Sequence, residues 1–498
     1  MTETELKLAL PMLPERLLER RVGALGALAG LPSTREDLHN TYYDTPDHAL
    51  LRQGAVLRVR KVRQGRKTVW LQTFKTSDRR MSALSTRGEW EFPLGGPALS
   101  QALLQGTPWQ TIDPEGQLFG QLKPCFVTRF SRTRWMCPGP DDSRIEVALD
   151  VGQIVSGERS SPIRELELEC KAGPGAALLT LAQSLATGLP CIPASQSKSQ
   201  RGYALAGHRA PASRTTTGGG RDAPVLQAMA VEALHDAFAQ FTGALIALCD
   251  QEDPQDVHQA RVGWRRLRSA QRLFRPVLDV PLDLSLAGLQ PLLDELTQLR
   301  ELDVARTQSL PPLESHFVAG DPSRAQRWQA MMGDLHEAGT RSRARVREHL
   351  ATVTTGQALL VVQSWLETGA VATDQGADMP HGKETPRRWA RRRLRRLSQA
   401  LRQACRALGT PVQADAQHHA RILAKRLRYG VEALRGLLPK ARARRWHRRA
   451  LHWQSVLGQQ RDAGQASTRV AGLPGHGDIA EFLRGYQAGI TSTPCAGT

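Results

Sequence analysis

The chain has 498 residues, of which 67 are Lys or Arg and 48 are Asp or Glu, so its formal net charge is +19. This length exceeds a single domain of about 150–250 residues and predicts at least two, and a hydrophobic fraction of 40% excludes wholesale disorder. The excess of positive charge favours a polyanionic partner.

No apolar run approaches the roughly 20 residues of a membrane-spanning helix, so no membrane association is expected. The N-terminal residues include acids where a signal peptide would be basic and then apolar. The seven cysteines are scattered and contain no CxxC pair, which is typical of a reducing compartment. We therefore expect a soluble cytoplasmic protein. The sequence carries no sign of its oligomeric state.

Two unlike segments meet at a stretch rich in Gly, Pro, Ser and Thr, which predicts a flexible linker over 207–224. Residues 1–206 alternate in period two and carry many turn signals, whereas 225–485 follow a 3.6-residue period. We predict a multidomain α+β protein with a β domain first and an all-α domain second. The tail, 486–498, is predicted to be disordered.

Charged residues recur at every second position through the first half. Because successive side chains of a strand point to opposite faces, each set shares one face, and the apolar residues between them would pack against helices. An ordinary sheet with one solvated face is the alternative for any single strand. The sets are Glu3, Glu5 and Lys7; Arg58 and Arg60; Arg87, Glu89 and Glu91; Arg132 and Arg134; Glu146 and Asp150; and Glu165, Glu167 and Glu169.

The signs of these charges are sorted along the chain, with paired carboxylates on the first and last strands and cations concentrated between them. Clustered carboxylates repel each other unless a cation neutralises them, which indicates a hard divalent ion such as Mg²⁺ or Mn²⁺. Arg and Lys beside such an ion would form a cradle for phosphate oxygens. A closed sheet would bring both sets into one tunnel, so we predict a short, highly charged phosphate chain as the ligand.

These residues resemble the CYTH, or triphosphate tunnel metalloenzyme, superfamily, because Glu3-Thr-Glu5-Leu-Lys7 matches its ExExK signature. The resemblance implies an eight-stranded antiparallel β tunnel with flanking helices that hydrolyses or rearranges triphosphates with a divalent metal. Further matches in the family's order cover essentially all of residues 1–206: Tyr42 to Asp47, Leu57 to Arg60, Phe74 and Lys75, Arg87 to Glu91, Glu146 to Gly152, Glu165 to Glu169, and Ser197 to Tyr203.

The resemblance also implies a role for each matching residue. The metal ligands would be Glu3, Glu5, Glu165 and Glu167, assisted by Asp150, and Glu169 shares their face as an alternative with the register shifted by two. Surface charge is the alternative for Arg134 and Arg201. The triphosphate would be held by Lys7 together with Arg58, Arg60, Lys75, Arg87, Arg132, Arg134, Lys198 and Arg201.

The implied mechanism follows from the charges. Metal and cations would neutralise the phosphoryl oxygens and the leaving pyrophosphate while a water attacks in line. Either Lys7 or a tunnel carboxylate would accept the proton of that water, and Glu89 would orient one of the cations.

The second half contains an internal duplication, because the motif H-x-x-R-[VI]-x-x-[RK]-R-L-R at 258–268 recurs without a gap at 418–428. Side chains at steps of three and four lie on one face of a helix. We name the two rows the first and second basic stripes. The first consists of His258, Arg261, Arg265, Arg268, Arg272 and Arg275, and the second of His418, Arg421, Lys425, Arg428 and Arg435.

Cations stacked without acids repel each other and favour a bound polyanion, although a solvated face is the plain alternative. The duplicated motif resembles the CHAD domain, an α-helical module, over about 225–485, and the fusion of CYTH to CHAD is a known bacterial arrangement. This implies two pseudo-symmetric four-helix bundles whose stripes bind inorganic polyphosphate. His419 is an alternative to His418 in the second stripe.

We therefore predict a metal-dependent inorganic triphosphatase, cleaving triphosphate to pyrophosphate and phosphate, joined to a polyphosphate-binding domain. Association with polyphosphate granules is a further expectation. Thiamine triphosphatase, adenylate cyclase and RNA triphosphatase share the fold and stay open, as does a non-catalytic polyphosphate scaffold. Nucleic-acid binding is less favoured, because 5 Tyr and 10 Phe offer few stacking surfaces for bases.

Overall fold

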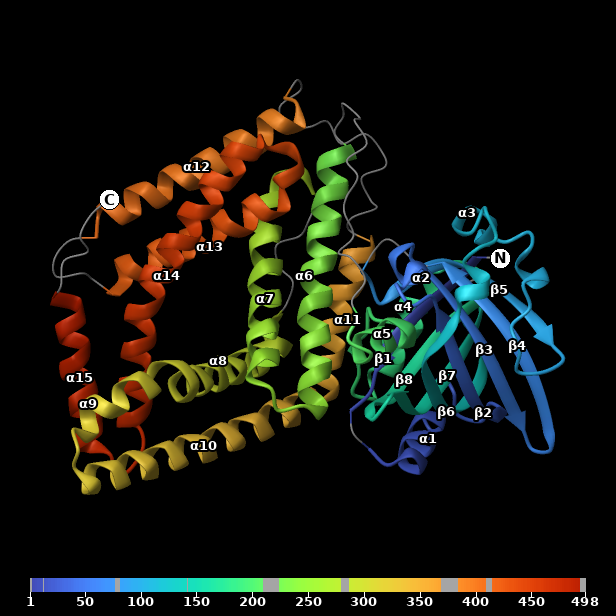
Figure 1. Cartoon of the computed structure of the whole chain (residues 1–498), viewed down its shortest axis with the longest axis horizontal. Helices are drawn as coiled ribbons and strands as arrows, with labels where there is room; N and C mark the ends of the chain where they lie inside the picture. The colour runs from blue at the N-terminus through green and yellow to red at the C-terminus, as the bar shows by residue number, and fades with distance from the viewer. Residues whose placement is uncertain are drawn as a thin grey trace.

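The computed structural model describes residues 2–11, 13–76, 81–140, 142–208, 224–278, 286–368, 384–408 and 414–492. It consists of a β barrel followed by a mostly helical region (Figure 1). The predicted α+β class is confirmed for both parts. The predicted linker lies outside the described residues except at its two ends.

Eight described antiparallel strands close the barrel in the order β5-β4-β3-β2-β6-β7-β8-β1, and β1 pairs with β5 to complete the circle. The two-residue strand β9 pairs with β1 beside them. The bounds are β1 (Thr2–Ala9), β2 (Ser33–Asp44), β3 (Ala55–Gln64), β4 (Lys67–Thr76), β5 (Leu84–Leu94), β6 (Lys123–Pro138), β7 (Arg144–Ser156), β8 (Arg159–Ala172) and β9 (Ile192–Pro193).

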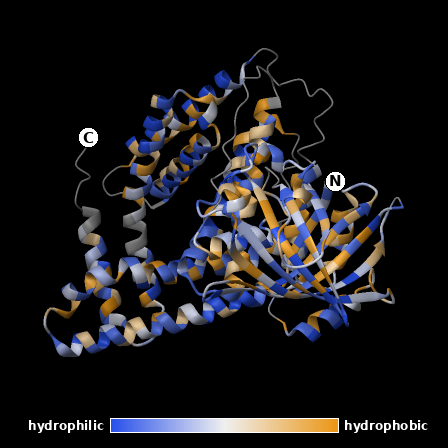
Figure 2. Ribbon diagram, turned by 45° about the vertical axis from the view of Figure 1, so that its right-hand side comes forward, coloured by the Kyte–Doolittle hydropathy of each residue, from blue (hydrophilic) through white to orange (hydrophobic). Residues whose placement is uncertain are grey.

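The alternation seen in the sequence separates the inside of the barrel from its outside, and Figure 2 shows hydrophilic and hydrophobic residues alternating along the strands. The charged positions face inward. The apolar positions, such as Leu6, Leu8 and Leu166, are fully buried in a cluster with Leu18 and Leu178 from the covering helices. The barrel helices are α1 (Glu15–Gly23), α2 (Ala49–Arg52), α3 (Trp109–Ile112), α4 (Ala177–Leu185) and α5 (Lys198–Leu205).

The helical region repeats itself as predicted, because an offset of 160 residues maps α7 onto α13 and α6 onto α12. One large apolar cluster joins α6–α8 and α10–α14, and a smaller one joins α8–α10 with α14 and α15. The two copies therefore share their cores. The bounds are α6 (Pro224–Asp250), α7 (Pro254–Phe274), α8 (Gln290–Val304), α9 (Glu314–Val318), α10 (Pro322–Leu350), α11 (Val353–Thr368), α12 (Pro386–Arg406), α13 (Ala414–Ala433), α14 (Lys440–Ala471) and α15 (Gly477–Ser492).

The end of the chain differs from its prediction as a disordered tail. Helix α15 continues to Ser492, so 486–492 are helical, and 493–498 lie outside the described residues. Apolar side chains continue at helical spacing here: Leu483 is buried, and the Tyr486 ring lies 6.5 Å from that of Phe482. Across the described helices, none combines the length and apolar character needed to span a membrane.

Helix α11 docks the helical region onto the barrel, and Figure 1 shows it between the two. Its Leu360 is buried in the apolar cluster of the barrel, while Ile192 of the barrel is buried in the large helical cluster. The Ser82 hydroxyl donates to Glu367 at 2.5 Å and accepts from Gln363 Nε2 at 2.9 Å. The interface is therefore both apolar and hydrogen-bonded.

Gly356 of α11 allows this close approach, because a Cβ there would lie 2.8 Å from the carbonyl oxygen of Cys191. We expect Gly356→Val to displace α11 and to lower the free energy of unfolding by about 1–3 kcal/mol. Gly339→Val in α10 is the matched control, since nothing lies within 4 Å of its Cβ position. Thermal unfolding followed by circular dichroism measures both, and equal losses would contradict the proposed packing.

Candidate active site

The barrel encloses a cavity of about 210 Å³ whose lining is mostly charged. It brings together most of the residues predicted for the triphosphate tunnel, contributed by strands around the whole barrel and by the start of α5. The predicted residues that line it are Glu3, Glu5, Lys7, Arg58, Arg60, Lys75, Arg87, Glu89, Arg132, Arg134, Glu167 and Lys198.

Three predicted residues, Asp150, Glu165 and Arg201, do not line this cavity. Asp150 and Glu165 are buried and pair with Lys198, whose Nζ lies 2.6 Å from Asp150 Oδ2. Arg201 lies 3.4 Å from Glu165 and donates to Ser161 Oγ at 3.1 Å. These groups neutralise one another beside the cavity and are not part of its wall.

The cavity wall also contains residues for which no role was predicted. Glu91, Glu146 and Lys171 occupy the same strand face as the predicted residues, so the period of two could have identified them. Glu169, the alternative ligand, lines the cavity as well. The other additions to the described lining are Tyr42, Val56, Thr73, Phe130, Ala148, Ser197 and Ser199.

Strand register sets the height of each charge in the barrel. Glu5 of β1 lies opposite Glu169 of β8, and Glu169 lies opposite Glu146 of β7, so three carboxylates form one row. In the next row Lys7 lies opposite Glu167. The closure of the barrel then places Arg87 of β5 opposite Glu3.

The cations of the cavity are already paired with its carboxylates. Lys75 Nζ lies 3.0 Å from Glu3 and 2.8 Å from Glu89. Arg58 lies 3.7 Å from Glu89, Arg60 lies 3.7 Å from Glu91, and Arg87 pairs with Glu5. An incoming phosphate chain would therefore find the donors preorganised and would exchange for carboxylate partners.

The pKa values distinguish an acidic side of the cavity from a basic side. Burial, together with Glu3 and Glu146, raises the pKa of Glu169 despite its pairing with Lys171 at 2.7 Å. Burial and the neighbouring charges of Arg58 and Arg132 lower the pKa of Arg60 to about 10, against the opposing effect of Glu91. The carboxylates thus lack cations on one side, and the guanidiniums lack anions on the other.

Glu89 stays ionised at neutral pH. Burial raises its pKa, but a hydrogen bond with Glu3 and the charges of Lys75 and Arg58 outweigh burial and lower the pKa to about 2. The charged carboxylate holds both cations in the cavity.

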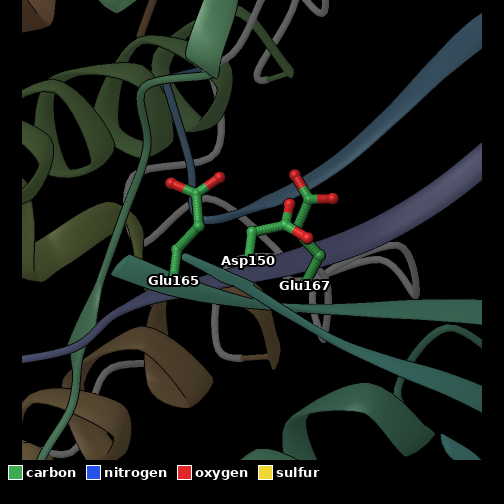
Figure 3. A group of neighbouring side chains, drawn as sticks. All are labelled: Asp150, Glu165 and Glu167. Carbon is green, nitrogen blue, oxygen red and sulfur yellow. The ribbon is translucent and has the colours of Figure 1, made fainter. Parts of the chain in front are cut away.

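Two groups of carboxylates have the chemistry to bind a hard divalent ion, which prefers oxygen ligands. Asp150, Glu165 and Glu167 have ligand oxygens within 4.8 Å of one another, and Figure 3 shows these side chains projecting from β7 and β8. Lys198 contacts all three of them. The second group is the row of Glu5, Glu169 and Glu146 with Glu3, where carboxylates raise the pKa of Glu169. The donor set fits such an ion.

Comparison with known proteins agrees with this geometry. A family model described as the CYTH domain matches residues 1–203, and one described as the CHAD domain matches residues 232–471. The chain therefore joins a CYTH domain to a CHAD domain.

An inorganic triphosphatase of Haemophilus influenzae is 36% identical to this chain over 170 residues, which are 34% of this chain and 46% of that protein. The match thus spans less than half of that relative. Among solved structures, the CHAD domain of the plant Ricinus communis is 24% identical with a TM-score of 0.46, covering 54% of this chain and 88% of its own. A putative adenylyl cyclase from Hippeastrum with a dominant triphosphatase activity is 18% identical with a TM-score of 0.31, covering 42% and 98%.

Lys198 is the main counter-charge for the buried acids Asp150 and Glu165. Lys198→Met would leave these carboxylates undercompensated, so we expect the free energy of unfolding to fall by about 3–5 kcal/mol. Lys67→Met, at an exposed position, removes the same charge and is the control. Urea unfolding at neutral pH measures both. A Lys198→Met variant as stable as the control would show that the pairing does not hold the barrel together.

Proposed function

We propose that the barrel hydrolyses inorganic triphosphate to pyrophosphate and phosphate with Mg²⁺ or Mn²⁺. The observation that carries this proposal is the cavity itself, which has carboxylates short of cations on one side and guanidiniums short of anions on the other. The CYTH match and the name of the Haemophilus relative support the same reaction class.

We infer that Glu3, Glu5, Glu167 and Glu169 would hold the ion, because they line the cavity. Asp150 and Glu165, which the sequence also suggested as ligands, would instead act as counter-charges for Lys198 and Arg132. A divalent ion bound there would neutralise phosphate oxygens and lower the pKa of a coordinated water.

The residues of the chain would bind the triphosphate and control its orientation. Arg58, Arg60 and Arg87 offer guanidinium forks, which suit bidentate contacts with phosphate oxygens. The full binding set would be Arg58, Arg60, Lys75, Arg87, Arg132, Arg134 and Lys198, which contact the cavity, while Arg201 would position Glu165.

The proton of the attacking water has two predicted acceptors. Lys7 donates a hydrogen bond to Glu5, so its amine already carries the proton that it would have to accept. A tunnel carboxylate is therefore favoured as the acceptor, and Lys7 would serve as a fixed cation in the row of Glu167. Glu89 would orient Lys75 and Arg58.

The composition of the lining favours an inorganic substrate. Among the described lining residues, only Tyr42, Val56, Phe130 and Ala148 are aromatic or aliphatic. A nucleobase or thiamine ring needs an apolar surface of its own. Nucleotide and thiamine triphosphates are the alternative substrates of the same fold.

Glu3→Gln combined with Glu5→Gln keeps side-chain size but removes two ligand charges. We expect phosphate release from triphosphate to fall at least about 100-fold, because loss of a partner beyond the ligands already costs up to about that factor. Release is measured with Mg²⁺ or Mn²⁺ from triphosphate, pyrophosphate, ATP, thiamine triphosphate and long-chain polyphosphate.

Asp37→Asn combined with Glu158→Gln is the control for this experiment, since both positions are exposed and neither lines the cavity. Unchanged turnover in Glu3→Gln/Glu5→Gln would refute the metal assignment. A wild-type protein that releases phosphate from none of these substrates would favour the non-catalytic scaffold.

We propose that the helical domain binds inorganic polyphosphate along both basic stripes, which would recruit the protein to polyphosphate granules. The stripes approach each other, because Arg428 of the second stripe acts electrostatically on His258 of the first. Burial and the cations Arg300, Arg265, Arg428 and Arg261 lower the pKa of His258 to about 4. A bound polyanion would relieve this crowding.

Polyphosphate binding should take up a proton at His258. A polyanion stabilises the imidazolium and raises the pKa, so affinity should increase as the pH falls. If the bound pKa returns to the ordinary value near 6.5, the gain between pH 8 and pH 5.5 is about tenfold.

Titration calorimetry at several pH values measures this dependence. His258→Ala should lose the gain, whereas His336→Ala, at an exposed position of α10, should keep it. The prediction is wrong if His258→Ala retains the pH dependence of the wild type.

A further inference from the structure

A groove between α12 and the first turns of α14 gathers arginines outside both the barrel and the basic stripes. It encloses about 730 Å³. Helix α12 contributes Arg388, Arg391, Arg392, Arg395 and Arg402 to its wall. Helix α14 contributes Arg442, Arg445 and the buried Trp446.

Packing does not explain these arginines. Arg388, Arg391 and Arg395 follow steps of three and four on the exposed face of α12, and Arg402 extends the row. The row runs over 14 residues, which is about 21 Å at 1.5 Å per residue. The opposite face already docks the helix through Trp389 and Leu394, which are buried.

The charges of the groove are poorly balanced within the described residues. Glu384 is the one carboxylate in its described lining, and it pairs with Arg392 at 2.5 Å. Burial and the cations Arg402 and Arg445 lower the pKa of Arg449 beside the groove. Guanidiniums therefore face other guanidiniums, and a bound anion would relieve the repulsion.

The groove is continuous with the first basic stripe. Arg393 of α12 donates to the backbone oxygen of Arg272, near the end of that stripe, at 3.1 Å. The charges of Arg392 and Arg396 in turn lower the pKa of Arg393, after burial. Cations thus lead without a described break from Arg272 across α12 to the groove wall.

We propose that this groove is a second phosphate-chain site, occupied by polyphosphate chains long enough to run from the first basic stripe over α12. It rests on the proposed polyphosphate binding and adds chain-length selectivity to it. Guanidinium forks suit phosphate oxygens. Trp446 is 5% exposed and cannot stack a base, so the groove fits an inorganic chain better than a nucleic acid.

Arg391→Ala combined with Arg395→Ala tests the site, because both side chains are exposed and the helix packs through other residues. We expect affinity for long-chain polyphosphate to fall at least about tenfold, since two charge-assisted contacts are lost. The slope of log affinity against log salt should fall by about 1. Affinity for chains too short to span the roughly 21 Å row should stay within about twofold.

Arg341→Ala combined with Arg484→Ala removes the same charge from exposed positions of α10 and α15, and should leave both affinities unchanged. Equal weakening of short and long chains in Arg391→Ala/Arg395→Ala would overturn the length selectivity. Unchanged long-chain affinity, or displacement of long chains by single-stranded DNA at equal phosphate concentration, would overturn the site.

Arg265→Ala combined with Arg268→Ala separates this proposal from the stripe assignment. It should weaken short and long chains alike. If that variant binds as the wild type does while the groove variant fails, the stripe assignment falls, and with it the path by which a chain reaches the groove. A wild-type protein that binds no polyphosphate would overturn both.

Discussion

Pairing of opposite charges inside a closed barrel is the constraint on which the rest of the structure depends. A buried carboxylate or guanidinium is costly unless a partner compensates it, and here partners such as Lys198 with Asp150 come from different strands or helices. Only a fixed register keeps such partners within reach. The apolar cluster on the outside of the barrel supplies that rigidity, so the interior can be devoted to phosphate chemistry and need not supply the core.

Alternation along the strands predicted which side chains enter the barrel, but not how high each one sits. Glu165 and Glu169 share a face, and only the pairing of Glu169 with Glu5 puts one in the cavity and leaves the other beside it. The contact between Glu3 and Arg87 arises from closure of β1 on β5, which no local pattern encodes. Helical periodicity likewise predicted the stripes, whereas the approach of Arg428 to His258 depends on how the two copies pack.

The duplication explains why the helical domain presents so much unbalanced positive charge. Each copy contributes one amphipathic helix, α7 or α13, whose apolar face enters a core shared between the copies. Sharing the core forces the two basic faces into proximity, because the same packing that buries the apolar residues sets the positions of the cations. The resulting repulsion is carried by the apolar cluster, and a polyanion would return that energy as binding affinity.

The two domains are also linked through the hydrogen bonds of Ser82. Its hydroxyl contacts Glu367 of α11, and the next residue, Ala83, accepts a backbone hydrogen bond from Lys7 at 3.1 Å. Ser85, two residues further, donates to Glu5 at 3.4 Å. A displacement of α11 would therefore be transmitted within a few residues to the strand pair that carries the charges of the cavity. Because α11 belongs to the same apolar cluster as the helices of both stripes, packing of the helical domain and geometry of the barrel site are parts of one mechanical unit.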